Sequence, residues 1–191
     1  GHIYLSNVLR IDDRFANVKG LFGDGFNKTR ITFDKIQDGE HDANSNSTDN
    51  RDYAGILVEN KNGFNIGSFS LEYTAKDQFY RAGKSYFGRV NGIYVNDSSN
   101  VLVTDVRVSG VNRAGVFFGS TKVYEVDPRS ATGKTYFNRV FSGEITENDP
   151  NIPLGVNNKV ENSYLYNNRV AGVLFGFQKN FVVNKNNLSS N

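Results

Sequence analysis

The stretch GIYVNDSSNVLVTDVRVSG, residues 92–110, contains the pattern that decides the fold. It holds three short apolar runs, and within each run apolar side chains stand at alternate positions. Such alternation is typical of a half-buried strand, and the Asn, Asp and Ser residues between the runs are turn formers. The stretch therefore predicts three short strands with a bend after each.

The same order of runs recurs elsewhere in the chain. Three further segments align with it on a leading glycine, and they begin at Gly55, Gly115 and Gly172. The four glycines are separated by 37, 23 and 57 residues, and the shortest spacing is long enough for three strands and their turns. Internal repeats near this period indicate a solenoid. The longer spacings predict loop insertions near residues 74–90 and 120–158, or, for the second, a further degenerate coil.

Alternation within the first strand of each repeat assigns its side chains to two faces. The inward positions, which should stack into one core, are Ile56, Val58, Ile93, Val95, Val116, Phe118, Val173 and Phe175. The outward positions are Leu57, Tyr94, Phe117 and Leu174. Asp105, Asn162 and Asn186 stand where the second strand should bend into the third, and such side chains tolerate the left-handed conformation.

Parallel strands stacked three to a coil make a parallel β-helix. We therefore expect an all-β solenoid, a single domain over residues 1–191 with about four to six coils. Its first and last coils would have open ends, so we expect it to be a fragment of a longer helix, completed by further coils of the same chain or by a homo-oligomer.

The composition agrees with this class and excludes others. The apolar fraction of 38% is enough for a sizeable core, and the absence of Cys excludes disulfides and thiolate chemistry. The net charge of +2 is too small to indicate a nucleic-acid partner. No apolar run approaches the roughly 18 residues that a membrane span needs.

The repeat order, G-I-x-V, a turn, N-V-x-V, a bend and V-x-V, resembles the right-handed parallel β-helix repeat of pectin-lyase-like proteins. Residues 4–34 are similar to the first complete coil of such proteins. The layout is most similar to alginate C5-epimerase catalytic modules, whose Tyr-Gly-Phe-Asp-Pro-His motif corresponds here to residues 114–119. This chain keeps the glycine of that motif and lacks its Tyr, Asp and His.

This resemblance implies a secreted or cell-surface protein that acts on polysaccharide in a groove over the first strands. The outward row of first-strand residues would then be either an exposed platform on which sugars stack or a surface covered by a loop or a partner subunit. Arg113 and Arg169 each precede a first strand. They are either turn residues or ligands for an anionic sugar.

The insertion at residues 77–91 carries the chemistry that an acidic polysaccharide requires. Residues 76–113 contain six basic and three acidic side chains. A cation neutralises a uronate carboxylate, while a Tyr or Lys of lowered pKa removes the C5 proton. The candidate catalytic residues are Arg81, Lys84, Tyr86 and Arg113. The candidate substrate-binding residues are Tyr80, Arg89, Tyr94, Phe117 and Arg169.

A second candidate site lies in the polar stretch of residues 38–52. Asp42, Asn44 and Asn46 alternate along a tight loop, and alternate oxygen ligands suit Ca²⁺. The competing interpretation is a flexible polar loop without a metal. Ca²⁺ is the one cofactor that the sequence indicates.

Three functions follow from these patterns. The first is an enzyme acting on acidic polysaccharide, lyase-like or epimerase-like. The second is a noncatalytic glycan-binding module. The third is a structural β-helix of an adhesin or phage tailspike.

Overall fold

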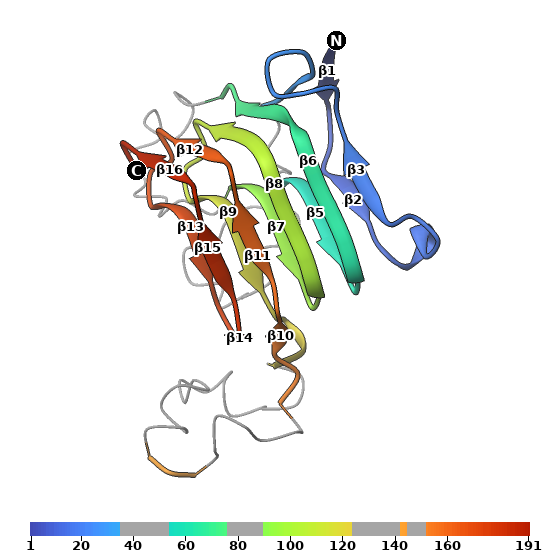
Figure 1. Cartoon of the computed structure of the whole chain (residues 1–191), viewed down its shortest axis with the longest axis vertical. Helices are drawn as coiled ribbons and strands as arrows, with labels where there is room; N and C mark the ends of the chain where they lie inside the picture. Colours follow the sequence, from blue (N-terminus) through green and yellow to red (C-terminus); the bar gives the residue numbers. More distant parts are fainter. Residues whose placement is uncertain (35–53, 76–89, 124–141, 145–151) are drawn as a thin grey trace.

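The computed structural model of the chain describes residues 1–34, 54–75, 90–123, 142–144 and 152–191. Every strand pair among them is parallel, and the chain winds as a parallel β-helix. Figure 1 shows successive coils side by side, with the sequence colours running from blue at one end of the stack to red at the other. The all-β class and the parallel strand arrangement that the sequence predicts are thus confirmed.

The described coils differ in how many separate strands they contain. β1 (His2–Leu5) comes first and pairs with a strand of the first complete coil, which holds β2 (Leu9–Ile11), the 3-10 helix η1 (Asp13–Phe15), β3 (Gly20–Phe22) and β4 (Arg30–Phe33). The next two coils hold β5 (Ala54–Glu59) with β6 (Asn62–Tyr73), and β7 (Asn91–Asn96) with β8 (Ser99–Ser109). The fourth holds β9 (Ala114–Gly119), β10 (Gly155–Val156), β11 (Lys159–Glu161) and β12 (Tyr164–Tyr166). The fifth holds β13 (Ala171–Phe175), β14 (Gln178–Lys179), β15 (Val182–Asn184) and β16 (Asn187–Ser189).

The first strands of the coils form one sheet, in the order β2-β5-β7-β9-β13. Because β13 pairs directly with β9, with Ala171 opposite Ala114, the repeats at Gly115 and Gly172 are neighbouring coils. The long spacing between them is therefore an insertion between β9 and β10, and no additional coil lies between them.

The core register is the one that the alternation predicts. Ile93, Val95, Val116 and Phe118 are buried in a single cluster. Val173 and Phe175, in the fifth coil, are partly buried against the same cluster. Tyr94 and Phe117 point away from it and belong to a separate cluster on the other face of the first-strand sheet.

The bend between the second and third strands is a column of left-handed residues. Ser68, Asp105, Asn162 and Lys185 have φ angles of 60°, 51°, 53° and 52°. Asp105 and Asn162 were predicted here. Asn186 also lies between the second and third strands of its coil and bonds the backbone as predicted, but the left-handed residue at that bend is Lys185, opposite Asn162.

Where the hydrogen bonds between strands of neighbouring coils are interrupted at the bends, asparagine side chains bond the backbone instead. Asn158 Oδ1 accepts from the Val101 N–H at 2.9 Å, and its Nδ2 donates to the Ser98 carbonyl at 2.9 Å. Asn186 and Asn191 make the same pair of bonds to the backbone of the preceding coil. Each amide therefore satisfies one donor and one acceptor that would otherwise be buried without a partner.

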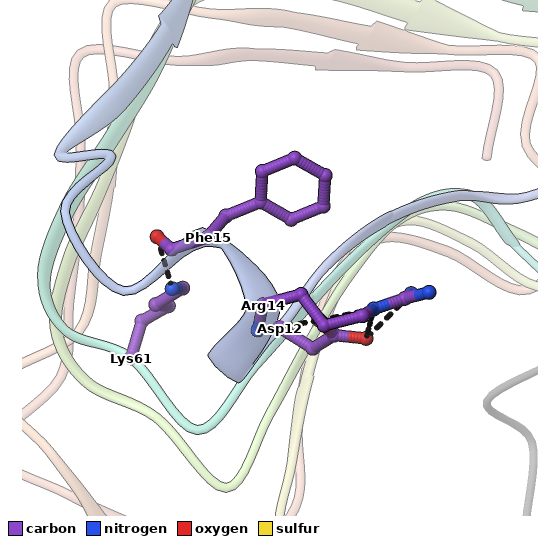
Figure 2. A network of polar contacts seen from close by, with 4 residues as sticks. All are labelled: Asp12, Arg14, Phe15 and Lys61. Carbon is purple, nitrogen blue, oxygen red and sulfur yellow. Dashed lines mark hydrogen bonds and ion pairs between the residues drawn. The ribbon is translucent and has the colours of Figure 1, made fainter.

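A buried lysine fixes η1 against the turn that joins β5 to β6. The Nζ of Lys61, which is 8% exposed, donates to the Phe15 carbonyl at 2.7 Å (Figure 2). Beside it, Arg14 forms an ion pair with Asp12 at 2.8 Å. The hydrogen bonds from Arg14 hold the pKa of Asp12 below its usual value.

We expect Asn158→Ala to destabilise the fold, because it leaves two buried backbone groups unsatisfied at about 1–3 kcal/mol each. The free energy of unfolding in urea measures the loss. The matched control is Asn157→Gly, which removes an exposed amide where φ is 58° and glycine is tolerated. Equal stability of the two variants would contradict the role given to Asn158.

Candidate functional site

Three of the four outward residues of the first-strand sheet are buried, and the fourth, Leu174, is half-buried. Tyr94 is 2% exposed and Phe117 is 8% exposed, and their rings stack with centroids 4.7 Å apart. The Tyr94 hydroxyl donates to Asn96 Oδ1 at 3.2 Å. Of the two predicted alternatives, a covered row agrees with the structure and an exposed sugar-stacking platform does not, because a buried ring cannot offer its face to a sugar.

Arg113 and Arg169 lie in the same turn of neighbouring coils. The N–H groups of Val170 and Ala171 both donate to the Arg113 carbonyl, so the two turns stack directly. The Arg113 guanidinium lies 4.4 Å from the centroid of the Phe117 ring. Arg169 is exposed. Their predicted roles in catalysis and ligand binding stay predictions.

The other predicted site residues lie outside the described residues. These are Tyr80, Arg81, Lys84, Tyr86 and Arg89 of the basic insertion, and Asp42, Asn44 and Asn46 of the predicted Ca²⁺ loop. Within the described ranges, no group of three or more His, Asp or Glu side chains is arranged to hold a metal ion.

A different surface of the helix gathers polar and aromatic side chains, and we call it the third-strand face. It consists of the outward residues of β4, the second half of β6, the second half of β8, and β12. In-register pairing aligns them into two columns. One column is Arg30, Ser70, Arg107 and Tyr164, and the other is Thr32, Glu72, Ser109 and Tyr166. Neighbours within a column are about 4.8 Å apart along the helix axis.

A cavity of about 250 Å³ opens on this face, and we call it the third-strand pocket. Its lining comes from four coils and from the connection between β3 and β4. The lining residues are Phe26, Asn27, Arg30, Ser70, Leu71, Glu72, Arg107, Ser109 and Tyr166. Small serines in the centre of both columns leave the space, and longer side chains surround it. The volume lies just below the roughly 300–1,000 Å³ of drug-sized ligand sites.

Arg107 packs against two aromatic rings. Its Cζ lies 4.7 Å from the centroid of the Phe26 ring and 5.8 Å from that of Tyr164. The two rings are also in contact, with centroids 5.6 Å apart. No carboxylate among the described residues pairs with Arg107. The rings therefore fix the guanidinium in place and leave its N–H groups available to an anion.

The second arginine of the pocket is neutralised. The Nη2 of Arg30 donates to Glu72 Oε2 at 2.7 Å, and the two side chains are 56% and 33% exposed. Among the described residues, Glu72 is the one carboxylate that lines the pocket. Because Arg30 and Glu72 cancel, Arg107 carries the net positive charge of the site.

Polar groups at the N-terminal end of the third-strand face are already paired. The Tyr4 hydroxyl donates to Asp34 at 2.6 Å, and this hydrogen bond raises the pKa of Tyr4. His2 Nε2 lies 2.9 Å from the Thr32 hydroxyl. Among the described residues of this face, the side chains of Arg107 and Ser109 and the hydroxyls of Tyr164 and Tyr166 have no polar partner.

The sequence contains a signal for this pocket, and that signal lies in the third strands of the repeats, not in the first strands. Arg107 is the middle residue of one third strand, and Tyr164 and Tyr166 flank the middle of another. Stacking those runs in register places the arginine beside the tyrosines. Phe26 carries no such signal, because it lies in a connection outside the repeat.

Comparisons of the chain with protein-family models, with curated proteins and with solved structures give no match. In the described part of the chain, no helix has the length and apolar character that crossing a membrane would require.

We expect Arg107 and Phe26 to be energetically coupled by about 0.5–1 kcal/mol, the usual value of a cation–π contact at an accessible site. A double-mutant cycle of Arg107→Gln and Phe26→Leu, read out as the free energy of unfolding, measures this coupling. The control cycle combines Phe26→Leu with Arg14→Gln, whose arginine lies in η1, and should give no coupling. If the Arg107–Phe26 cycle shows no more coupling energy than the control cycle, the stacked arrangement is contradicted.

Proposed function

We propose that the chain is a noncatalytic glycan-binding domain whose third-strand pocket binds an anionic sugar residue of an acidic polysaccharide. The observation that carries the proposal is Arg107, a guanidinium that packs against Phe26 and Tyr164 and has no carboxylate partner in the described residues. A planar guanidinium donates two parallel hydrogen bonds to a carboxylate, so a uronate is a suitable ligand.

The remaining pocket groups support a saccharide over a simple anion. Ser70, Ser109 and the Tyr166 hydroxyl are neutral groups that exchange hydrogen bonds with sugar hydroxyls. The Phe26 ring on the rim offers an apolar edge to the C–H face of a pyranose. A small inorganic anion would leave these groups without ligand contacts.

The columns of the third-strand face also support a polymer. They run along the helix axis and continue through β1 and β16 on either side of the pocket. An extended polysaccharide laid along this axis would meet one coil about every 4.8 Å, a distance close to the length of one sugar residue.

The proposal also covers the family, the location and the chemistry of the chain. Membership of the pectin-lyase-like superfamily and a secreted or cell-surface location rest on the repeat pattern alone. Lyase-like or epimerase-like processing of the same polymer depends on Arg113 together with Arg81, Lys84 and Tyr86, of which the last three lie outside the described residues. Release of unsaturated uronate, followed by ultraviolet absorbance, distinguishes lyase activity from binding alone.

We expect the chain to bind hyaluronan, alginate or polygalacturonate, and to bind the neutral glucan dextran more weakly. Arg107→Gln should weaken binding of the best acidic polymer by tenfold or more, since a hydrogen bond to a charged group contributes about 1.5–3 kcal/mol. The loss should shrink as salt rises, because screening weakens the charge interaction in the parent protein. Isothermal titration calorimetry measures both effects.

Arg14→Gln is the matched control, because it removes the same charge from an exposed arginine outside the pocket. It should leave the affinity within about twofold of the parent. Equal losses from both substitutions would show a general charge effect and would contradict the assigned site. Dextran binding as tightly as the acidic polymers would contradict an acidic ligand.

A further inference from the structure

The pocket contains a carboxylate that an acidic ligand has to accommodate. Glu72 Oε2 accepts from Arg30, and no described residue donates to Glu72 Oε1. The side chain is 33% exposed and lines the cavity. Its Oε1 can therefore accept a hydrogen bond from a ligand hydroxyl, whereas a ligand carboxylate at the same place would be repelled.

The position of Glu72 relative to Arg107 sets which part of a polymer it meets. Ser70 is the direct neighbour of Arg107 across the ladder, and Glu72 lies two residues farther along the same strand. With ordinary strand dimensions, the Cα atoms of Glu72 and Arg107 are about 8 Å apart. This separation exceeds the length of one sugar residue, so the two side chains contact neighbouring residues of a bound chain.

We propose that Glu72 makes the third-strand pocket selective for glycans in which an anionic sugar alternates with a neutral one. Arg107 binds the carboxylate of the anionic residue, and Glu72 Oε1 accepts a hydroxyl of the neutral neighbour. A polymer with a carboxylate on every residue places a second negative charge against Glu72, which disfavours it. The inference rests on the proposed function and adds the residue that sets ligand specificity.

The test compares two size-matched oligosaccharides by calorimetry. Hyaluronan oligosaccharides alternate a uronate with a neutral N-acetylhexosamine, and oligogalacturonates carry a uronate at every residue. The parent protein should prefer hyaluronan oligosaccharides by about tenfold or more, because unfavourable contacts with the wrong ligand create specificity. Glu72→Gln should reduce this preference mainly by tightening oligogalacturonate binding.

Two further variants separate Glu72 itself from changes in charge. Asp12→Asn breaks the Arg14–Asp12 pair, which lies outside the pocket, and changes the net charge equally, so it should leave the preference unchanged. In the double variant Glu72→Gln/Arg30→Gln, net charge returns to that of the parent while the carboxylate is still missing. This double variant should show the same loss of preference as Glu72→Gln.

The possible results distinguish the two proposals. Acidic-glycan binding stands if both acidic ligands bind and Arg107→Gln weakens both. In that case the role of Glu72 is wrong if the parent shows no preference, or if Glu72→Gln leaves the preference in place. A preference restored in the double variant would assign the effect to net charge and would also overturn the role of Glu72. If neither acidic ligand binds, the proposed function itself fails.

Discussion

In-register parallel stacking is the constraint on which the rest of the structure depends. Because each strand pairs with its equivalent in the next coil, every position of the repeat becomes a column along the axis. Inward columns bury the apolar side chains, and bends are columns of left-handed residues such as Asp105 and Asn162. Where the ladder breaks at a bend, an asparagine amide takes its place, as Asn158 does. The same constraint that builds the core also aligns surface groups from separate coils into the third-strand face.

The third-strand pocket is a direct product of this alignment. Its two columns bring arginine, serine, glutamate and tyrosine side chains from four coils to one face, although those residues are far apart in the chain. The ladder fixes their backbone, so a ligand meets groups whose spacing is set before it binds, which lowers the entropic cost of association. The guanidinium of Arg107 is held by the rings of Phe26 and Tyr164. In the proposed function, Glu72 would limit which neighbours the bound anion can have.

Much of the fold could be predicted from the sequence, because the decisive information is local and repeated. Alternation alone assigns Ile93 and Val95 to the core and Tyr94 to the opposite face, and the structure agrees. Exposure of Tyr94 could not be predicted in this way, because burial depends on what lies above a strand and the repeat pattern does not encode that. The pocket was missed for a related reason. It requires the register between the third strands of several coils, together with a ring, Phe26, from a connection that has no periodic signal.

The most direct measurement of the central claim is a chemical-shift titration of isotope-labelled protein with a hyaluronan oligosaccharide. We expect the largest chemical-shift changes at the side-chain N–H of Arg107 and at the amides of Ser70, Ser109 and Tyr166. The amide of Tyr94, on the first-strand sheet, should not change. Such a pattern would place an acidic sugar in the third-strand pocket. Shifts concentrated along the first strands, with Arg107 unaffected, would contradict the account.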